Sequence, residues 1–518
     1  MVWVQLESQP ASGTSVGAAS NDAQEPVAVI AFAEPSDEPA AQPAPAPLTP
    51  AATHDIAPPS RLEQLMATGW AAPAELPVET EPVAVRAGDR RRRLSALFAG
   101  DTLVLPSGPL KVRSNDTDYP FRPDSDFVWL TGCAEPDAVL LVHPDGEGVL
   151  YLADRASRST SAFYTDRRYG ELWVGPRRGV RETSAALGLR CLPLDELDAA
   201  LDRLAPATTR LLREVDPRID AKVRPVGDAK REQALAVTTS ELRLYKDDFE
   251  ISELERAVAA TGRGFAECVR EMPVAYGMDR GERWIEGTFW RRARLEGNEV
   301  GYGSIVATGP HATTLHWVRN DGRVQPGDLA LLDMGVEVDS FYTADVTRTL
   351  PVDGHFRDVQ RQVYDVVLAA QQAGIDATKP GADFLAPHRA AMSVIAHALE
   401  DWGFLGVPAA ESLQDNVGLH RRYTLHSTSH MLGLDVHDCA NARAESYGKG
   451  PLAEGMVLTV EPGLYFQSDD LTVPPEFRGI GVRIEDDVLV TGDGCRVLSD
   501  GLPRTAQDVE EWVRELQA

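Results

Sequence analysis

Four carboxylates and one imidazole stand in strand-like or turn-like runs of the C-terminal half of the chain. They are Asp333, Asp345, His430, Glu461 and Glu485. Charged side chains are rarely placed among apolar residues unless they are paired or bind a metal. Several carboxylates with a single imidazole suit a hard or borderline divalent cation such as manganese better than a structural zinc ion. These residue types therefore predict a carboxylate-rich metal site.

The two aspartates are expected on neighbouring strands. Asp333 ends the apolar run 329–332, and Asp345 lies twelve residues later among Thr and Val residues. Residues 335–340 can turn the chain, and a hairpin would bring opposed side chains within about 5 Å of each other. Two carboxylates that close raise each other's pKa unless a cation neutralises them, so metal bridging is the straightforward interpretation. The alternative is a pair of exposed aspartates at strand ends.

Three of the eleven histidines fall within twelve residues, at His426, His430 and His437. The spacing of the first two would suit two zinc ligands on one face of a helix. No Glu follows His426, however, so this is not the HExxH zinc motif. A cluster of hydrogen-bonded histidines in the core is the alternative interpretation.

Glu461 and Glu485 are each expected beside a strand. Glu461 follows the run 456–460 and precedes Pro462 and Gly463, which predicts a carboxylate at a sheet edge or cleft rim. Glu485 and Arg483 are expected on one face of a strand over 482–490, because side chains alternate along a strand. An arginine beside a liganding carboxylate can orient that ligand. The alternative for each residue is an ion pair on a strand face.

These residues need a scaffold, and 518 residues predict two folded domains with extensions. Residues 1–60 hold ten of the 36 prolines and no Lys or Arg, so this tail is expected to be extended and disordered. Residues 61–245 are interpreted as a mixed α/β domain. Its predicted strands are 103–105, 127–130, 139–142, 149–152 and one that begins at 211–212, and a helix is predicted over 194–204. A helix over 252–271 opens a second domain that covers 250–510.

Charge and cysteine usage exclude several functions. The net charge of −28 argues against non-specific nucleic-acid binding and against attraction to anionic membranes. No apolar run approaches 18 residues, so no membrane span is predicted, and the N-terminus lacks a secretory pattern. The five scattered cysteines indicate a reducing compartment without a disulfide framework, and a nucleophilic role for Cys439 is disfavoured. The basic cluster 90–93 is interpreted as a solvated helix face, in preference to a site for an acidic partner.

A series of ordered motifs resembles the Xaa-Pro aminopeptidase (aminopeptidase P) family, one of the pita-bread metallopeptidases. The motifs are Gly309-Pro310-His311-Ala312-Thr313-Thr314-Leu315-His316, Leu332-Asp333-Met334-Gly335, Ala344-Asp345-Val346-Thr347-Arg348-Thr349, the segment from His426 to Asp438, Glu461-Pro462-Gly463-Leu464-Tyr465, and Gly481-Val482-Arg483-Ile484-Glu485-Asp486. The resemblance implies an α+β fold with a C-terminal pita-bread metallopeptidase domain. A mixed α/β N-terminal domain of the aminopeptidase P type and the disordered tail would precede it. The loop between the two aspartates is one residue longer than usual, but no ligand is missing.

The resemblance also implies a site with two divalent metal ions, usually Mn²⁺. Asp333 would chelate one metal, Asp345 and Glu485 would bridge both, and His430 with Glu461 would complete the other. His316, His426 and His437 would line the substrate pocket, Arg483 would orient a ligand, and Glu461 would move the proton of the attacking water.

The implied activity is release of the N-terminal residue from peptides with proline in second position. The family further implies a homodimer or homotetramer, and a cytoplasmic location is expected. One alternative is a prolidase that accepts only Xaa-Pro dipeptides. The other is a non-catalytic pita-bread scaffold, although such scaffolds typically lack the ligands present here.

Overall fold

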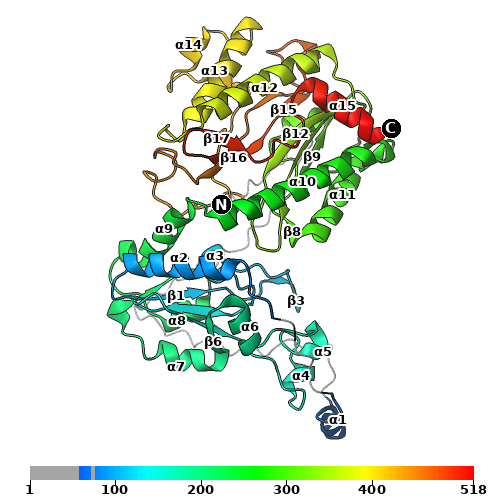
Figure 1. The fold of residues 1–518 in the computed structure, drawn as a ribbon. Coiled ribbons are helices and arrows are strands. Elements are labelled where there is room, and N and C mark those ends of the chain that lie inside the picture. The colour runs from blue at the N-terminus through cyan, green and yellow to red at the C-terminus, as the bar shows by residue number, and fades with distance from the viewer. Residues whose placement is uncertain (1–57, 72–75, 77) are drawn as a thin grey trace, which may run out of the picture. The chain divides into compact units, whose positions relative to one another are not determined.

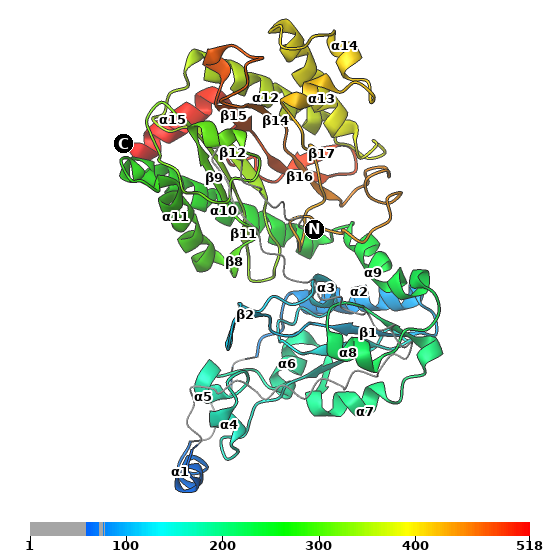
Figure 2. The same cartoon turned by 180° about the vertical axis from the view of Figure 1, so that it is seen from behind.

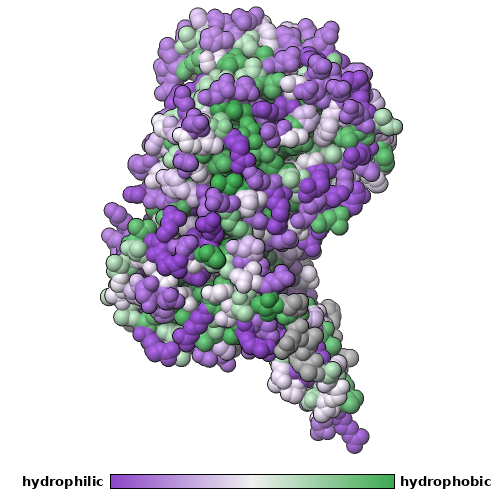
Figure 3. Space-filling view, viewed as in Figure 1, coloured by the Kyte–Doolittle hydropathy of each residue, from purple (hydrophilic) through white to green (hydrophobic). Residues whose placement is uncertain are grey.

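The computed structural model describes residues 58–71, 76 and 78–518 (Figure 1). The predicted disordered tail therefore lies, up to residue 57, outside the described residues. Residues 58–518 form one compact unit. Within the described ranges, no helix combines the length and the apolar character needed to cross a membrane. The face drawn in Figure 3 is mostly hydrophilic, consistent with 79 acidic and 51 basic residues.

The first half of the chain builds a five-stranded sheet in the order β6-β5-β4-β1-β7, with β1 antiparallel to β4 and parallel to β7. The strands of this half are β1 (Thr102–Pro106), β2 (Val112–Ser114), β3 (Thr117–Asp118), β4 (Val139–Val142), β5 (Gly148–Leu152), β6 (Arg190–Pro193) and β7 (Thr209–Leu211). The helices are α1 (Ser60–Met66), α2 (Val83–Leu97), α3 (Ser125–Thr131), α4 (Ala162–Thr165), α5 (Glu171–Val174), α6 (Val180–Leu187), α7 (Leu197–Leu201), α8 (Pro217–Lys222) and α9 (Ala229–Arg243), with the 3-10 turns η1 (Leu194–Glu196) and η2 (Pro206–Thr208). The strands predicted at 103–105, 139–142 and 149–152 are confirmed. The strand predicted to begin at 211–212 is β7, which ends at Leu211. In place of one helix over 194–204, the structure has the 3-10 turn η1 followed by the short helix α7.

The strand predicted at 127–130 is wrong, because these residues belong to helix α3. Asp124 caps the helix by accepting hydrogen bonds from the backbone N–H of Asp126 and Phe127, at 3.0 and 3.1 Å. Gly132 ends it at φ 72°, a left-handed conformation that favours glycine. Every residue of α3 is buried, so its apolar run carries no periodicity that separates a helix from a strand.

The interpretation of residues 90–93 as a solvated face is also wrong for half of the cluster. Arg90 is 2% exposed, lies 2.8 Å from Asp247 and donates a hydrogen bond to the Trp129 carbonyl oxygen. Arg91 is buried as well and donates to the Leu130 carbonyl oxygen at 2.7 Å. These two guanidinium groups hold the C-terminal end of α3, where carbonyl groups lack partners within the helix.

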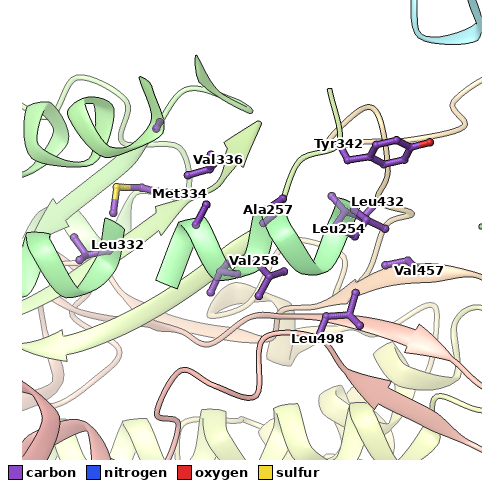
Figure 4. Packing of buried hydrophobic residues seen from close by; sticks show 14 of the residues in the cluster. Leu254, Ala257, Val258, Leu332, Met334, Val336, Tyr342, Leu432, Val457 and Leu498 are labelled. Atoms are coloured by element: carbon purple, nitrogen blue, oxygen red, sulfur yellow. The ribbon is translucent and has the colours of Figure 1, made fainter. Parts of the chain in front are cut away.

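The second half of the chain begins with two helices that lie side by side, α10 (Asp248–Ala275) and α11 (Gly281–Glu296) (Figures 1 and 2). The later helices are α12 (Asp358–Ala377), α13 (Ala386–Asp401), α14 (Ala409–Ser412) and α15 (Ala506–Gln517), with the 3-10 turns η3 (Gly309–Thr313), η4 (Leu419–Arg422) and η5 (Pro475–Phe477). The helix predicted over 252–271 is confirmed as part of α10. It starts earlier because Asp247 and Glu250 form a capping box. Figure 4 shows Leu254 and Val258 of α10 packed in one cluster with Leu332 and Met334.

Short antiparallel sheets carry the predicted site residues. Their orders are β12-β10-β9, β13-β16-β17, β14-β15 and β11-β8. The strands are β8 (Glu299–Val300), β9 (Ile305–Thr308), β10 (Leu329–Met334), β11 (Val336–Glu337), β12 (Val346–Pro351), β13 (Val457–Val460), β14 (Gly463–Phe466), β15 (Ile480–Arg483), β16 (Asp486–Val490) and β17 (Cys495–Val497). The predicted pairing of the strands after residue 329 is confirmed, since Met334 of β10 pairs with Val346 of β12. A Cβ at Gly335 would lie 1.8 Å from the Ala344 carbonyl oxygen, so only glycine fits this crossing.

Ion pairs, most of them buried, connect the end of α9 with α3 and with the loop that follows His430. Arg243 donates to Asp126 at 2.7 Å and to Asp435 at 2.9 Å, and Lys246 donates to Asp438 at 2.8 Å. Burial alone would raise the pKa of the Asp438 carboxyl, but the charges of Arg243 and Lys246 lower that pKa well below its usual value. The loop that carries His437 is therefore held by cations from an earlier part of the chain. The domain boundaries 61–245 and 250–510 stay predictions.

Candidate metal centre

The structure brings every predicted site residue to the wall of one pocket of about 650 Å³. The residues are Asp333, Asp345, His430, Glu461 and Glu485, together with His316, His426, His437 and Arg483. They come from segments more than 160 residues apart in the sequence, so the fold and not local sequence assembles the group.

Asp345, His430 and Glu485 form the centre of this group. Each offers one ligand atom, and these three atoms all lie within 4.8 Å of one another. The Asp345 Oδ2 atom is 3.3 Å from His430 Nε2, and Glu461 Oε1 is 3.6 Å from the same nitrogen. Asp333 and Asp345 are only 8% and 6% exposed. The alternative of exposed aspartates at strand ends is therefore wrong.

The register of β10 and β12 places the aspartates diagonally. Asp333 pairs with Thr347, and Asp345 lies two residues before Thr347, so the two carboxylates are not directly opposed as predicted. Thr347 also connects to the fourth carboxylate: its Oγ1 donates to Glu485 Oε2 at 2.6 Å, and its carbonyl oxygen accepts from the Glu485 N–H at 3.1 Å. The strand predicted over 482–490 is broken at residues 484 and 485, which frees the Glu485 backbone for this contact.

His430 and Glu461 are delivered by extended chain. The carbonyl oxygen of His430 accepts from the Thr459 N–H at 3.0 Å, and the Glu461 N–H donates to the Thr428 carbonyl oxygen at 2.9 Å. Residues 423–437 contain no helix, so two zinc ligands on one helix face are excluded. The turn after β13 places Glu461 at the pocket wall, as predicted.

The electrostatics of the group favour a bound cation. Burial raises the pKa of Asp333 and of Glu485, and the neighbouring carboxylate Asp345 raises both further. Burial and Asp345 likewise raise the pKa of Glu461 to about 7, although the His430 charge opposes this. Burial lowers the pKa of His430, but the hydrogen bond to Asp345 and the Glu461 charge outweigh it and raise this pKa to about 9. The four carboxylates outnumber the two cations beside them, His430 and Arg483, so these oxygen and nitrogen donors fit divalent ions.

Arg483 and two histidines form the polar wall around the carboxylates. Arg483 donates to Asp333 Oδ2 at 2.5 Å and to the Tyr465 hydroxyl at 3.0 Å. The same hydroxyl lies 2.8 Å from His426 Nε2. Burial, together with the Arg483 charge, lowers the pKa of His426 to about 4, so this ring is neutral at pH 7. The His437 ring stands edge-on to the His430 ring at 4.5 Å.

Two contacts of the site were not predicted. The Tyr302 hydroxyl donates to Asp333 Oδ1 at 2.7 Å, and an aromatic residue between Gly301 and Gly303 is the only sequence signal for it. Thr347 stands two residues after Asp345, and strand alternation could have identified it.

Cys439 was interpreted correctly as non-nucleophilic: it is 2% exposed, and burial raises the pKa of its thiol.

The segment that carries His316 is organised by Glu282 of α11. This carboxylate is fully buried and accepts hydrogen bonds from the Thr308 and Gly322 N–H groups, at 2.8 and 2.6 Å. It also accepts from the Trp317 indole at 2.8 Å and lies 2.9 Å from His311 Nδ1. The His311 and Trp317 rings stack at 3.9 Å. The Glu282 carboxylate thus holds the chain segments that precede and follow His316.

Replacing Glu282 by alanine should lower the free energy of unfolding by at least about 3 kcal/mol, because several buried donors would lose their acceptor. Urea unfolding of the purified variant measures this change. Leu295→Ala, at a 70% exposed position of the same helix, is the control and should change stability little. Equal stability of the two variants would contradict the role of Glu282.

Comparisons with known proteins show which family this chain resembles. Residues 252–492 match the model of metallopeptidase family M24, and residues 87–212 match the aminopeptidase P N-terminal domain. The chain is 51% identical over 459 residues to Xaa-Pro aminopeptidase 1 of Streptomyces coelicolor, covering 88% of this chain and 92% of that relative. It is 31% identical over 444 residues to the Xaa-Pro aminopeptidase of Escherichia coli, covering 81% and 96%. Among solved structures, the aminopeptidase PepP of Pseudomonas aeruginosa matches with a TM-score of 0.73 at 31% identity, over 85% of this chain and 99% of that chain.

Proposed function

Because the chain belongs to the Xaa-Pro aminopeptidases of metallopeptidase family M24, we propose that it releases the N-terminal residue from peptides with proline in second position. The family implies divalent metal ions, and we propose two Mn²⁺ ions at this site. The observation that carries the proposal is the group of two buried carboxylates, Asp345 and Glu485, with His430, whose ligand atoms lie within 4.8 Å of one another. A non-catalytic scaffold has no need for this costly burial of charge.

The metal ions would be held by the five residues that the sequence singled out. Asp333 would bind one ion, Asp345 and Glu485 would be shared, and His430 with Glu461 would bind the other. Bound divalent ions lower the pKa of water and polarise a carbonyl group. Side chains of the protein would transfer the protons and donate hydrogen bonds to the transition state.

Glu461 is proposed to accept the proton of the attacking water and to return it to the proline nitrogen as the peptide bond breaks. Its carboxylate lines the pocket and lies 3.6 Å from His426 Nδ1 and from His430 Nε2. His316 and His437 are proposed to donate hydrogen bonds to the oxygen that gains charge in the transition state. Arg483 is proposed to fix the orientation of Asp333, and neutral His426 lines the same pocket.

The test is hydrolysis of Ala-Pro and of Ala-Pro-Ala with Mn²⁺ supplied, followed by detection of free alanine. The tripeptide is expected to be cleaved faster, because an aminopeptidase must accept residues beyond the proline. Cleavage of the dipeptide alone would identify a prolidase, and cleavage of neither would favour a scaffold. We further propose a cytoplasmic homodimer or homotetramer, which light scattering of the purified protein tests for its oligomeric state.

A further inference from the structure

A second hollow of about 800 Å³ adjoins the site pocket, and His426 and Ser427 line both. Its walls come from α13 and from the segment between α14 and His426. Figure 1 shows α13 and α14 next to each other, and α13 packs on α12. None of the four carboxylates of the site lines this second hollow.

The hollow exposes apolar side chains. Leu385 and Leu425 on its wall are 39% and 64% exposed, and Met392 and Leu413 also line it. Leu425 directly precedes His426, so apolar surface begins at the edge of the site pocket. Apolar wall of this kind suits the side chains of a bound peptide.

Arg421 provides a cation in the same hollow. The neighbouring Arg389 lies 3.3 Å from Asp383, and Arg422 lies 2.9 Å from Asp470. Arg421 is exposed, and no carboxylate among the described residues lies within ion-pair distance of it. Asp415 lines the hollow too, but it does not pair with Arg421.

The two histidines of the hollow add no positive charge to that of Arg421. Burial lowers the pKa of His388 and of His420, and the Arg421 charge lowers both further. Both rings are therefore neutral at pH 7, so neither carries a charge that would attract or repel an anion.

We propose that this hollow receives the substrate residues that follow the proline, and that Arg421 binds a carboxylate there. The inference rests on the proposed function, because an aminopeptidase keeps one residue before the cleaved bond and must accommodate all residues after it. The carboxylate is either the free C-terminus of a short peptide or an acidic side chain of a longer one. A dipeptide has no residue after the proline and leaves the hollow unused.

The experiment compares two pairs of peptides with the Mn²⁺-loaded full-length protein. Ala-Pro-Phe and its C-terminal amide differ in the terminal carboxylate. The amidated tetrapeptides Ala-Pro-Phe-Asp and Ala-Pro-Phe-Lys differ in a side chain. The wild-type protein should cleave the carboxylate-bearing member of at least one pair with about two- to fivefold higher kcat/KM, the range of an exposed ion pair. Arg421→Glu should abolish or reverse that preference, mainly through KM.

Arg270→Glu is the matched control, since Arg270 is an exposed arginine of α10 that lines neither hollow. It should retain the wild-type preference. The inference is overturned if the wild-type protein cleaves all four peptides equally, or if both variants behave alike, while the proposed function stands. If the wild-type protein releases alanine from none of the four, the proposed function fails and the inference fails with it.

Discussion

Asp345→Ala should abolish peptide hydrolysis and leave the fold intact. The Asp345 carboxylate lies 3.3 Å from His430, and its ligand atom is within 4.8 Å of those of both His430 and Glu485. Removing one of four crowded carboxylates relieves repulsion between the others, so stability should not fall greatly. The measurements are kcat on Ala-Pro-Ala with Mn²⁺, bound metal by elemental analysis, and thermal unfolding.

Asp339→Ala is the control for this variant. Asp339 lies in the same turn between β10 and β12, but its side chain is 76% exposed. It should keep wild-type activity and metal content. If Asp345→Ala retains more than a tenth of the wild-type kcat, a barrier change below about 1.4 kcal/mol, the bridging role is refuted.

His437→Ala should lower kcat by about 10²–10³-fold while the protein keeps its metal, because a donor to the transition state supplies an effect of this size. His430→Ala should instead lose metal together with activity. The two ring centroids are 4.5 Å apart, so either substitution opens a cavity beside the remaining ring. Each variant therefore controls for the effect of such a cavity in the other. Both proteins are assayed on Ala-Pro-Ala and analysed for manganese.

A reversed result, with metal lost from His437→Ala and kept by His430→Ala, would show that the roles are exchanged. Full metal and full activity in both variants would mean that the histidines only pack against each other. The second result would refute the proposed metal centre at His430.

The sequence alone predicted which residues converge on one pocket better than it predicted their geometry. Asp333 and Glu461 could be located because each ends an apolar run next to a turn, which is a local pattern. The diagonal placement of Asp333 and Asp345 could not be predicted, since register depends on the glycine crossing at Gly335. The contact of Tyr302 with Asp333 joins residues 31 positions apart, and no periodicity in the sequence encodes it.

The errors in the first half have a common physical cause. The run 127–130 is apolar on all sides, so only its capping residues Asp124 and Gly132 distinguish a helix from a strand. Arg90 and Arg91 were assigned to solvent because arginine is usually exposed. Their burial depends on carbonyl groups of α3 and on Asp247, which tertiary structure alone brings near.

The ion pairs of Arg243 and Lys246 bear on how this protein can be divided. The family-model match starts at residue 252 and the predicted catalytic domain starts at 250, and both boundaries exclude these two cations. A recombinant fragment cut at either boundary would leave Asp438 buried without a counter-charge, next to the loop of His437. Loss of a buried partner typically costs about 3–5 kcal/mol. Chimeras between relatives should therefore exchange Arg243, at the end of α9, and Lys246 together with the catalytic half.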